Sequence, residues 1–230
     1  MSEVSLYARL RLAFVGLVYA DHNRSAGVRR TVAAALAAMP AEGFGLNVGA
    51  GSTRIDPRVR NLDIFAGPNI DYVGRAEAIP LPDASVDLVL TQETLEHVAD
   101  PFAAMREIHR VLKPGGTLYL QLPFIIGYHP GPTDYWRFTR EGMVRLLEVA
   151  GLECLEIGVA VGVSTGFYRT AVEYLAILFS VPLPPMYMPL KALFALLLYP
   201  IKWLDPVTNL SRQTDRVAGG YYVLARKAAR

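Results

Sequence analysis

Residues 46–52 read Leu46-Asn47-Val48-Gly49-Ala50-Gly51-Ser52, and residues 59–64 read Val59-Arg60-Asn61-Leu62-Asp63-Ile64. These stretches predict a short apolar strand, a glycine turn and a second short strand that ends in a carboxylate. Glycines let the backbone approach a ligand where a Cβ atom would collide. A carboxylate at the end of the second strand accepts hydrogen bonds from ribose hydroxyls. Together, Gly49, Gly51 and Asp63 indicate a nucleoside site.

The spacing within this site argues against NAD and FAD. A dinucleotide-binding turn has a third glycine three residues after the second, and an acid about 20 residues further along the chain. This chain has Arg54 where the third glycine would stand, and its acid follows Gly51 by about a dozen residues. We therefore expect a nucleoside without a pyrophosphate.

The next segments predict alternating strands and helices. A strand is expected at 86–92, a helix at 101–113 and a strand at 117–123. Apolar residues of the helix recur at helical spacing, and Pro101 suits its first turn. The helix is expected to end where Pro114 follows Lys113.

Four sequence segments together resemble the class I S-adenosylmethionine-dependent methyltransferases, in particular the small-molecule type similar to the ubiquinone-biosynthesis enzymes. The segments read LNVGAGS, AEAIPLPDASVDLVL, LEHVADP and REIHRVLKPGGTLYLQLP. The resemblance covers roughly residues 44–160 and a last strand at 220–226. It implies an α/β, Rossmann-like seven-stranded sheet with helices on both faces and a helical apolar insertion before the last strand. The implied units are an N-terminal helical cap (1–40), a cofactor-binding core (41–160 plus 218–230) and the insertion (161–217).

The resemblance implies S-adenosylmethionine as the cofactor, and it implies the residues that bind it: Gly49, Gly51, Asp63, Ile64, Ala76, Glu77 and Gln92. Three residues depart from the family's pattern. Asn47 replaces a frequent acid, Thr53 a frequent glycine, and Arg75 the acid near the adenine. These departures leave an alternative open, in which the chain is a catalytically inactive, methyltransferase-like binding or scaffold protein. An NAD-dependent oxidoreductase is a third reading, which Arg54 disfavours.

The segment 123–139 is expected to form the acceptor site, because it follows a central strand and is rich in proline and glycine. His129 is the predicted general base, since an unperturbed histidine titrates near neutrality. The predicted substrate-binding residues are Tyr128, Asp134, Tyr135, Trp136 and Arg137. Asp134 and Arg137 are alternatively a pair that holds the loop. The DYWRFT pattern resembles relatives linked to glycan gene clusters, which suggests a small-molecule, glycan or lipid-linked acceptor.

No metal site is predicted. Glu93 and His97 are four residues apart and share a helix face. Two ligands without a third in the sequence do not make a metal site. His97 is instead expected to be a structural histidine beside the cofactor.

Composition agrees with a cytoplasmic globular enzyme. The formal net charge of +2 is too small to indicate a nucleic-acid partner. Cys154 is the single cysteine, so no intramolecular disulfide is expected. Residues 4–20 are expected to form an amphipathic helix that covers the core or lies on a membrane surface, and a second helix is expected at 25–39.

The apolar segment 165–204 is the other unusual region. Residues 174–190 carry no charge, and prolines divide the segment into two predicted helices, at 166–180 and 188–204. We expect the helices to cap the mouth of the pocket, with an apolar outer face rimmed by Arg169, Lys191 and Lys202. Three readings are open: a buried cap or homodimer surface, a peripheral contact with the inner face of the membrane, and a membrane-spanning hairpin, which the prolines disfavour.

Overall fold

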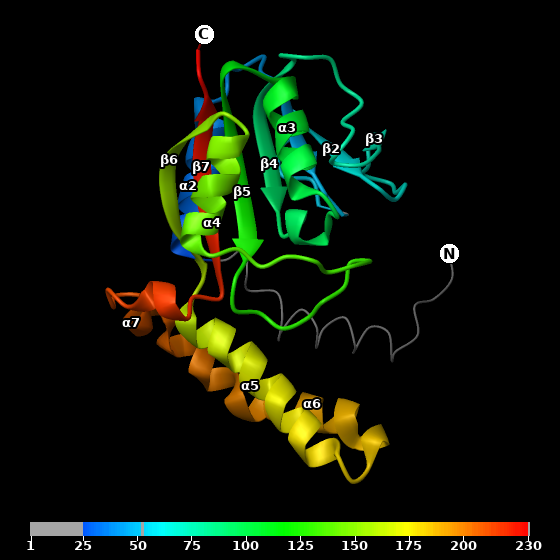
Figure 1. Cartoon of the computed structure of the whole chain (residues 1–230), viewed down its shortest axis with the longest axis vertical. Coiled ribbons are helices and arrows are strands. Elements are labelled where there is room, and N and C mark those ends of the chain that lie inside the picture. Colours follow the sequence, from blue (N-terminus) through cyan, green and yellow to red (C-terminus); the bar gives the residue numbers. More distant parts are fainter. Residues whose placement is uncertain (1–24, 52, 230) are drawn as a thin grey trace.

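The structure, a computed structural model, describes residues 25–51 and 53–229. Its centre is a seven-stranded sheet with the order β3-β2-β1-β4-β5-β7-β6 (Figure 1). The strands are β1 (Gly45–Val48), β2 (Val59–Asp63), β3 (Tyr72–Val73), β4 (Val86–Gln92), β5 (Leu112–Pro123), β6 (Leu152–Val161) and β7 (Gly220–Lys227). The pairs among β1 to β5 are parallel, and β7 runs antiparallel to both β5 and β6. The predicted Rossmann-like, seven-stranded sheet is therefore confirmed.

Helices cover both faces of the sheet, as predicted. Leu88 and Leu90 of β4 pack in one cluster with Val28 of α2 (Ala26–Ala38). Val89 between them packs in the other cluster, with α3 (Pro101–Val111) and α4 (Arg140–Val149). Successive side chains of a strand point to opposite faces, so the apolar centre of β4, Leu88 to Leu90, is buried on both sides of the sheet.

Local signals explain where the helices begin. Asp100 accepts a hydrogen bond from the backbone of Ala103, and Pro101 occupies the first turn of α3. Ser25 caps α2 through the backbone N–H of Val28. A side chain at such a position satisfies one of the donors that a helix leaves free. The predicted strand at 86–92 matches β4, and the helix predicted at 101–113 ends two residues early.

The insertion between β6 and β7 is helical. It comprises α5 (Val163–Ser180), the 3₁₀-helix η2 (Pro184–Met186), α6 (Tyr187–Leu198), the 3₁₀-helix η3 (Tyr199–Leu204), α7 (Asp205–Thr208) and the 3₁₀-helix η4 (Thr214–Arg216). The prolines at η2 separate α5 from α6, as predicted. The α5–α6 hairpin projects beyond the carboxyl ends of the central strands (Figure 1). Asp205 anchors it by accepting hydrogen bonds from Ser164 and Thr165.

The predicted cationic rim of this hairpin is wrong. Arg169 and Lys202 are buried, and Lys191 pairs with Glu173. Lys202 lies over the rings of Tyr168 and Tyr199, so its ammonium group faces inward. Within residues 25–51 and 53–229, the helices lack the combination of length and apolarity that crossing a bilayer requires.

Two further features concern the amino-terminal part. The helix predicted at 4–20 lies outside the described residues. In the described part, no helix separates β1 from β2, which agrees with the short interval between the glycine turn and Asp63. Further along the chain, the 3₁₀-helix η1 (Leu95–His97) follows β4. It places its side chains at the edge of the sheet where β1 and β4 end.

Candidate functional site

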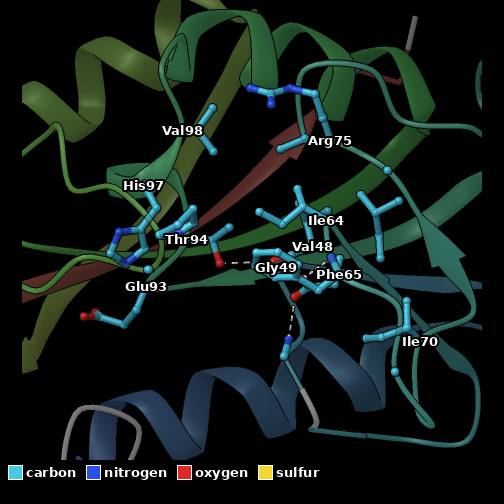
Figure 2. Close-up of a pocket in the computed structure, with 18 of the residues that line it drawn as sticks. Val48, Gly49, Ile64, Phe65, Ile70, Arg75, Glu93, Thr94, His97 and Val98 are labelled. Carbon is cyan, nitrogen blue, oxygen red and sulfur yellow. Dashed lines mark hydrogen bonds between the residues drawn. The ribbon is translucent and has the colours of Figure 1, made fainter.

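A cavity of about 690 Å³ opens at the carboxyl ends of β1, β2 and β4. This is the edge at which open α/β sheets bind ligands, and the volume lies in the range of small-molecule sites. The segment after β2 contributes Ile64, Phe65 and Ile70, and the segment after β4 contributes Glu93, Thr94 and His97 on the other side (Figure 2). The cavity therefore lies between the glycine turn and two loops.

The glycine turn fits this cavity for two different reasons. Gly49 has a φ of +69°, and a Cβ atom there would lie 2.2 Å from Cγ2 of Thr94. Thr94 is fixed because its hydroxyl donates to the carbonyl of Val48 at 3.2 Å. Gly51 has a φ of +53°, and a Cβ atom there would have no protein atom within 4 Å. The space beside Gly51 is thus open to a ligand, whereas Gly49 is required by the protein itself.

The Asp63 carboxylate is held at the end of β2. Its two oxygens accept hydrogen bonds from the backbone N–H groups of Gly51 (2.8 Å) and Phe65 (3.0 Å). A carboxylate oxygen accepts more than one hydrogen bond. Asp63 therefore retains acceptor capacity for a diol, and Ile64 and Phe65 beside it supply an apolar wall. These residues fit the nucleoside end of S-adenosylmethionine.

The loop after β3 is fixed from two sides. Arg75 forms an ion pair with Glu77 at 2.8 Å, and both residues line the cavity. Glu107 of α3 accepts from the backbone N–H of Ile79 and pairs with Arg110. The hydrogen bond from Arg110 holds the pKa of Glu107 below its usual value. These hydrogen bonds and ion pairs position the loop that contains Ala76 and Glu77.

Asn47 and Arg54 support the turn from outside the cavity. Asn47 is buried and donates to the side chain of Asn61, on the neighbouring strand, at 3.4 Å. Arg54 pairs with Asp71 at 2.9 Å and donates to the carbonyl of Val59. Neither side chain lines the cavity. The asparagine that replaces a frequent acid therefore has a structural contact of its own.

The cavity brings together most of the residues predicted for the cofactor. Six of the seven line it: Gly49, Gly51, Asp63, Ile64, Ala76 and Glu77. Gln92 does not line it, because it is the last residue of β4 and its side chain hydrogen-bonds to the hydroxyl of Tyr119. Glu93 and Thr94, which follow Gln92, line the cavity in its place.

Asp134 and Arg137, from the segment predicted to bind the acceptor, hold that segment together. Their side chains form a two-fold ion pair, with distances of 2.5 and 2.7 Å. Asp134 also accepts from the backbone N–H of His129 at 2.8 Å. The arginine holds the pKa of Asp134 at about 2. The loop-holding reading of this pair is confirmed by its geometry.

The aromatic residues of the same loop differ in their surroundings. Tyr135 lines the cavity, together with Gly131, Pro132 and Thr133. Trp136 donates from Nε1 to the carbonyl of Val98 at 3.0 Å, so it ties the loop to the segment after η1. Tyr128 is 77% exposed and does not line the cavity. Of the predicted substrate-binding residues, only Tyr135 reaches the described cavity.

Glu93 has a strained backbone next to the cavity. Its φ is +53°, in a region that non-glycine residues seldom adopt and that is concentrated at functional sites. Its carboxyl accepts from Nε2 of Gln121 at 3.0 Å. Burial, reinforced by the nearby Glu96 carboxylate, raises the pKa of Glu93 to about 7. Glu93 thus places a neutral or weakly acidic carboxyl at the cavity.

The structure also forms a cluster of Glu96, His97 and His129, which the sequence did not predict. Oε1 of Glu96 lies 3.6 Å from Nε2 of His97 and 3.6 Å from Nε2 of His129. The Glu96 carboxylate raises the pKa of His129, although burial opposes this shift. The sequence pattern pairs His97 with Glu93. It does not reveal the contact between Glu96 and His129, because His129 comes from a loop far away in the sequence.

The prediction that His129 is the general base gains no support from its position. Its Nδ1 bonds to the carbonyl of Gly127 at 2.8 Å, and its Nε2 faces Glu96. His129 does not line the cavity, whereas His97 does. The role of His129 as a base remains a prediction.

Comparisons with known proteins agree with this geometry. The family model described as a methyltransferase domain matches residues 33–120. A probable S-adenosylmethionine-dependent methyltransferase of Mycolicibacterium smegmatis is 36% identical over 93 residues, which cover 37% of this chain and 36% of that protein. The ubiquinone/menaquinone biosynthesis C-methyltransferase UbiE of Pseudoalteromonas translucida is 51% identical over 62 residues, which cover 26% of this chain and 24% of that protein. The matches thus span about a third or less of these relatives.

A solved structure shows the same fold over most of the chain. The crystal structure of a putative methyltransferase from Bacillus halodurans aligns with a TM-score of 0.54 at 17% identity, covering 86% of this chain and 98% of that one. The sheet order, the glycine turn with Asp63, and the family match over β1 to β5 lead to one assignment. Residues 33–120 match the methyltransferase-domain family, and there the chain is similar to S-adenosylmethionine-dependent methyltransferases, whose methyl donor is S-adenosylmethionine.

Proposed function

We propose that the protein transfers a methyl group from S-adenosylmethionine to an apolar, glycan-containing or lipid-linked acceptor. The observation that carries the proposal is the cavity beside Gly51 and Asp63. It combines open space at a glycine with a positive φ, a fixed carboxylate for ribose, and an apolar wall at Ile64 and Phe65.

The chain's contribution to such a transfer is mainly positional. When bound, the cofactor supplies a methyl group that a sulfonium already activates. Asp63 and the glycine turn would fix the nucleoside, and Glu93, Thr94 and Tyr135 would border the methyl end. Alignment of the reacting groups and exclusion of water account for a large part of the acceleration in such displacements. A base is needed only when the acceptor carries a proton on the attacking atom.

The helical hairpin supports a contact with a lipid surface. Among the apolar side chains of α5 and α6, those that are fully buried are Tyr168, Val172, Ala176 and Ala195. Apolar side chains on its surface are exposed over the uncharged run 174–190, including Phe179, Val181 and Leu183. Because the cations nearby are buried or paired, we propose that attachment rests on apolar burial and does not require anionic lipid.

A flotation assay tests the lipid contact. The protein should float with uncharged phosphatidylcholine vesicles at low and at high salt, and Val181→Glu should weaken this binding. Val149→Glu is the matched control, because Val149 is an exposed valine on α4, outside the hairpin. The proposal is contradicted if the protein does not float with vesicles and instead dimerises through the hairpin. The apolar surface would then bind a second copy of the chain.

The methyl transfer itself is tested by the products. Purified protein, S-adenosylmethionine and candidate acceptors should yield S-adenosylhomocysteine together with an acceptor heavier by one methyl group. Asp63→Ala should lower the yield at limiting cofactor. Tight cofactor binding without any product, over a broad set of lipid-linked and glycan acceptors, would favour the inactive binding or scaffold protein.

A further inference from the structure

We propose that Glu96, His97 and His129 bind a divalent transition-metal ion beside the cavity. Their potential ligand atoms all lie within 4.8 Å of one another. One carboxylate and two imidazoles form a ligand set that proteins use for catalytic zinc and for non-haem iron. This inference does not depend on the proposed methyl transfer.

The hydrogen bonds of the two histidines prepare them as ligands. Nδ1 of His97 lies 2.5 Å from the carbonyl of Thr133, and Nδ1 of His129 lies 2.8 Å from the carbonyl of Gly127. A carbonyl only accepts, so each Nδ1 carries the proton in these bonds. Metal-ligating histidines almost always donate their other ring N–H to such a partner. Metal binding displaces any proton on Nε2, and each Nε2 then presents a lone pair toward Glu96.

The distances within the cluster fit a bound metal ion better than direct hydrogen bonds between the glutamate and the histidines. Each Nε2 lies 3.6 Å from Oε1 of Glu96. A charge-assisted N–H to carboxylate bond is about 2.7–2.9 Å long. Two ligands of a tetrahedral ion with bonds of about 2.1 Å lie about 3.4 Å apart. The separations therefore exceed a hydrogen bond and match two ligand pairs around a metal.

Glu96 supplies an independent observation. It is fully buried, and neither of its carboxylate oxygens has a hydrogen-bond partner in the described structure. An ionised carboxylate that is removed from water is costly unless it is paired or coordinates a metal. Its Oε1 lies 3.6 Å from Nε2 of each of the two imidazoles. A divalent cation at this point would satisfy the carboxylate and both lone pairs.

The cluster is accessible from the cavity. His97 lines the cavity, and so do Glu93 and Thr133 on either side of it. Three protein ligands leave a coordination position free, as in catalytic zinc sites. With a metal bound, Nε2 of His129 is a ligand and cannot accept a proton from the acceptor. The metal role therefore excludes the predicted role of His129 as a general base.

The test is metal binding to the whole chain, without cofactor. The apoprotein, prepared with a chelator, is titrated with Zn²⁺ in a calorimeter and with Co²⁺ by visible absorption. We expect one ion per chain and a Co²⁺ spectrum of a nitrogen- and oxygen-ligated site. Glu96→Gln, His97→Asn and His129→Asn should each weaken binding at least tenfold. His109→Asn is the matched control, because that histidine lies on α3 outside the cluster and should leave the affinity unchanged.

Thermal unfolding of each variant without metal separates ligand loss from misfolding. Absence of stoichiometric binding by a wild-type chain that melts cooperatively would overturn the proposal, and the cluster would then be a histidine–glutamate ion pair. An equal effect of His109→Asn would also overturn it, because binding would not be located at the cluster. Because the readout is the metal alone, its failure is distinct from a failure to bind S-adenosylmethionine.

Discussion

Replacing Gly51 by alanine is expected to affect cofactor binding much more than folding stability. Gly51 has a φ of +53°, and an added Cβ atom would meet no protein atom within 4 Å. An alanine there loses about 1–2 kcal/mol of stability from the left-handed backbone alone. The same Cβ atom would occupy the space that the turn leaves open beside Asp63. We therefore expect a modest loss of stability and a large loss of cofactor affinity.

Gly49→Ala is the matched comparison, because it differs in what the Cβ atom meets. Its φ of +69° carries a similar strain, but its Cβ atom would lie 2.2 Å from Cγ2 of Thr94. Overpacking of this kind adds about 1–3 kcal/mol. Gly49→Ala should thus cost about 2–5 kcal/mol of stability in total. In a domain of this size, each kcal/mol lowers Tm by about 2–4 °C.

Thermal melting and calorimetry with S-adenosylhomocysteine measure the two effects. Gly51→Ala should lower Tm by about 2–8 °C and should weaken cofactor binding at least tenfold, which is about 1.4 kcal/mol. Gly49→Ala should show the larger drop in Tm. The reasoning is refuted if Gly51→Ala binds the cofactor as tightly as the wild type, since the open space would then lie outside the binding site.

Two further predictions concern single carboxylates. Asp63→Ala should weaken S-adenosylmethionine binding by about 1–3 kcal/mol, because the hydrogen bonds from the ribose hydroxyls to the Asp63 carboxylate are lost. If calorimetry gives the variant and the wild type equal affinities, Asp63 does not bind the cofactor. The hydrogen bond from Arg110 is the main cause of the lowered pKa of Glu107 in the folded protein. The stability that this interaction contributes is therefore complete above the unfolded pKa of about 4.3. It is lost as the pH falls through the lower folded pKa. Glu107→Gln should lower the urea midpoint at pH 7 and flatten its decline in acid, and parallel curves for variant and wild type would contradict this.

Much of the fold could be predicted because its signals are local. The strand predicted at 86–92 coincides with β4, and Pro101 marks the beginning of α3 because proline fits a first helical turn. The glycine turn could likewise be located, since Gly49 and Gly51 both adopt a positive φ that glycine favours. These features depend on neighbours in the chain.

Features that depend on distant contacts escaped prediction. Glu96 and His129 meet only because η1 and the loop after β5 end at the same edge of the sheet. The positions of Arg169, Lys191 and Lys202 in the insertion could not be predicted for a similar reason, because they are buried or paired through contacts within the folded hairpin. Periodicity identifies an amphipathic helix but does not reveal that Lys202 would lie over the rings of Tyr168 and Tyr199. The sequence thus predicts that these helices form, but not which side chains they bring into contact.

Calorimetric titration of the wild-type chain with S-adenosylmethionine, beside an identical titration with NAD, tests the central claim most directly. The turn at Gly51, the carboxylate of Asp63 and the cavity predict S-adenosylmethionine binding at micromolar strength, about 7–8 kcal/mol, and no measurable heat with NAD. Tight binding of NAD with no heat from S-adenosylmethionine would contradict the assignment of the site.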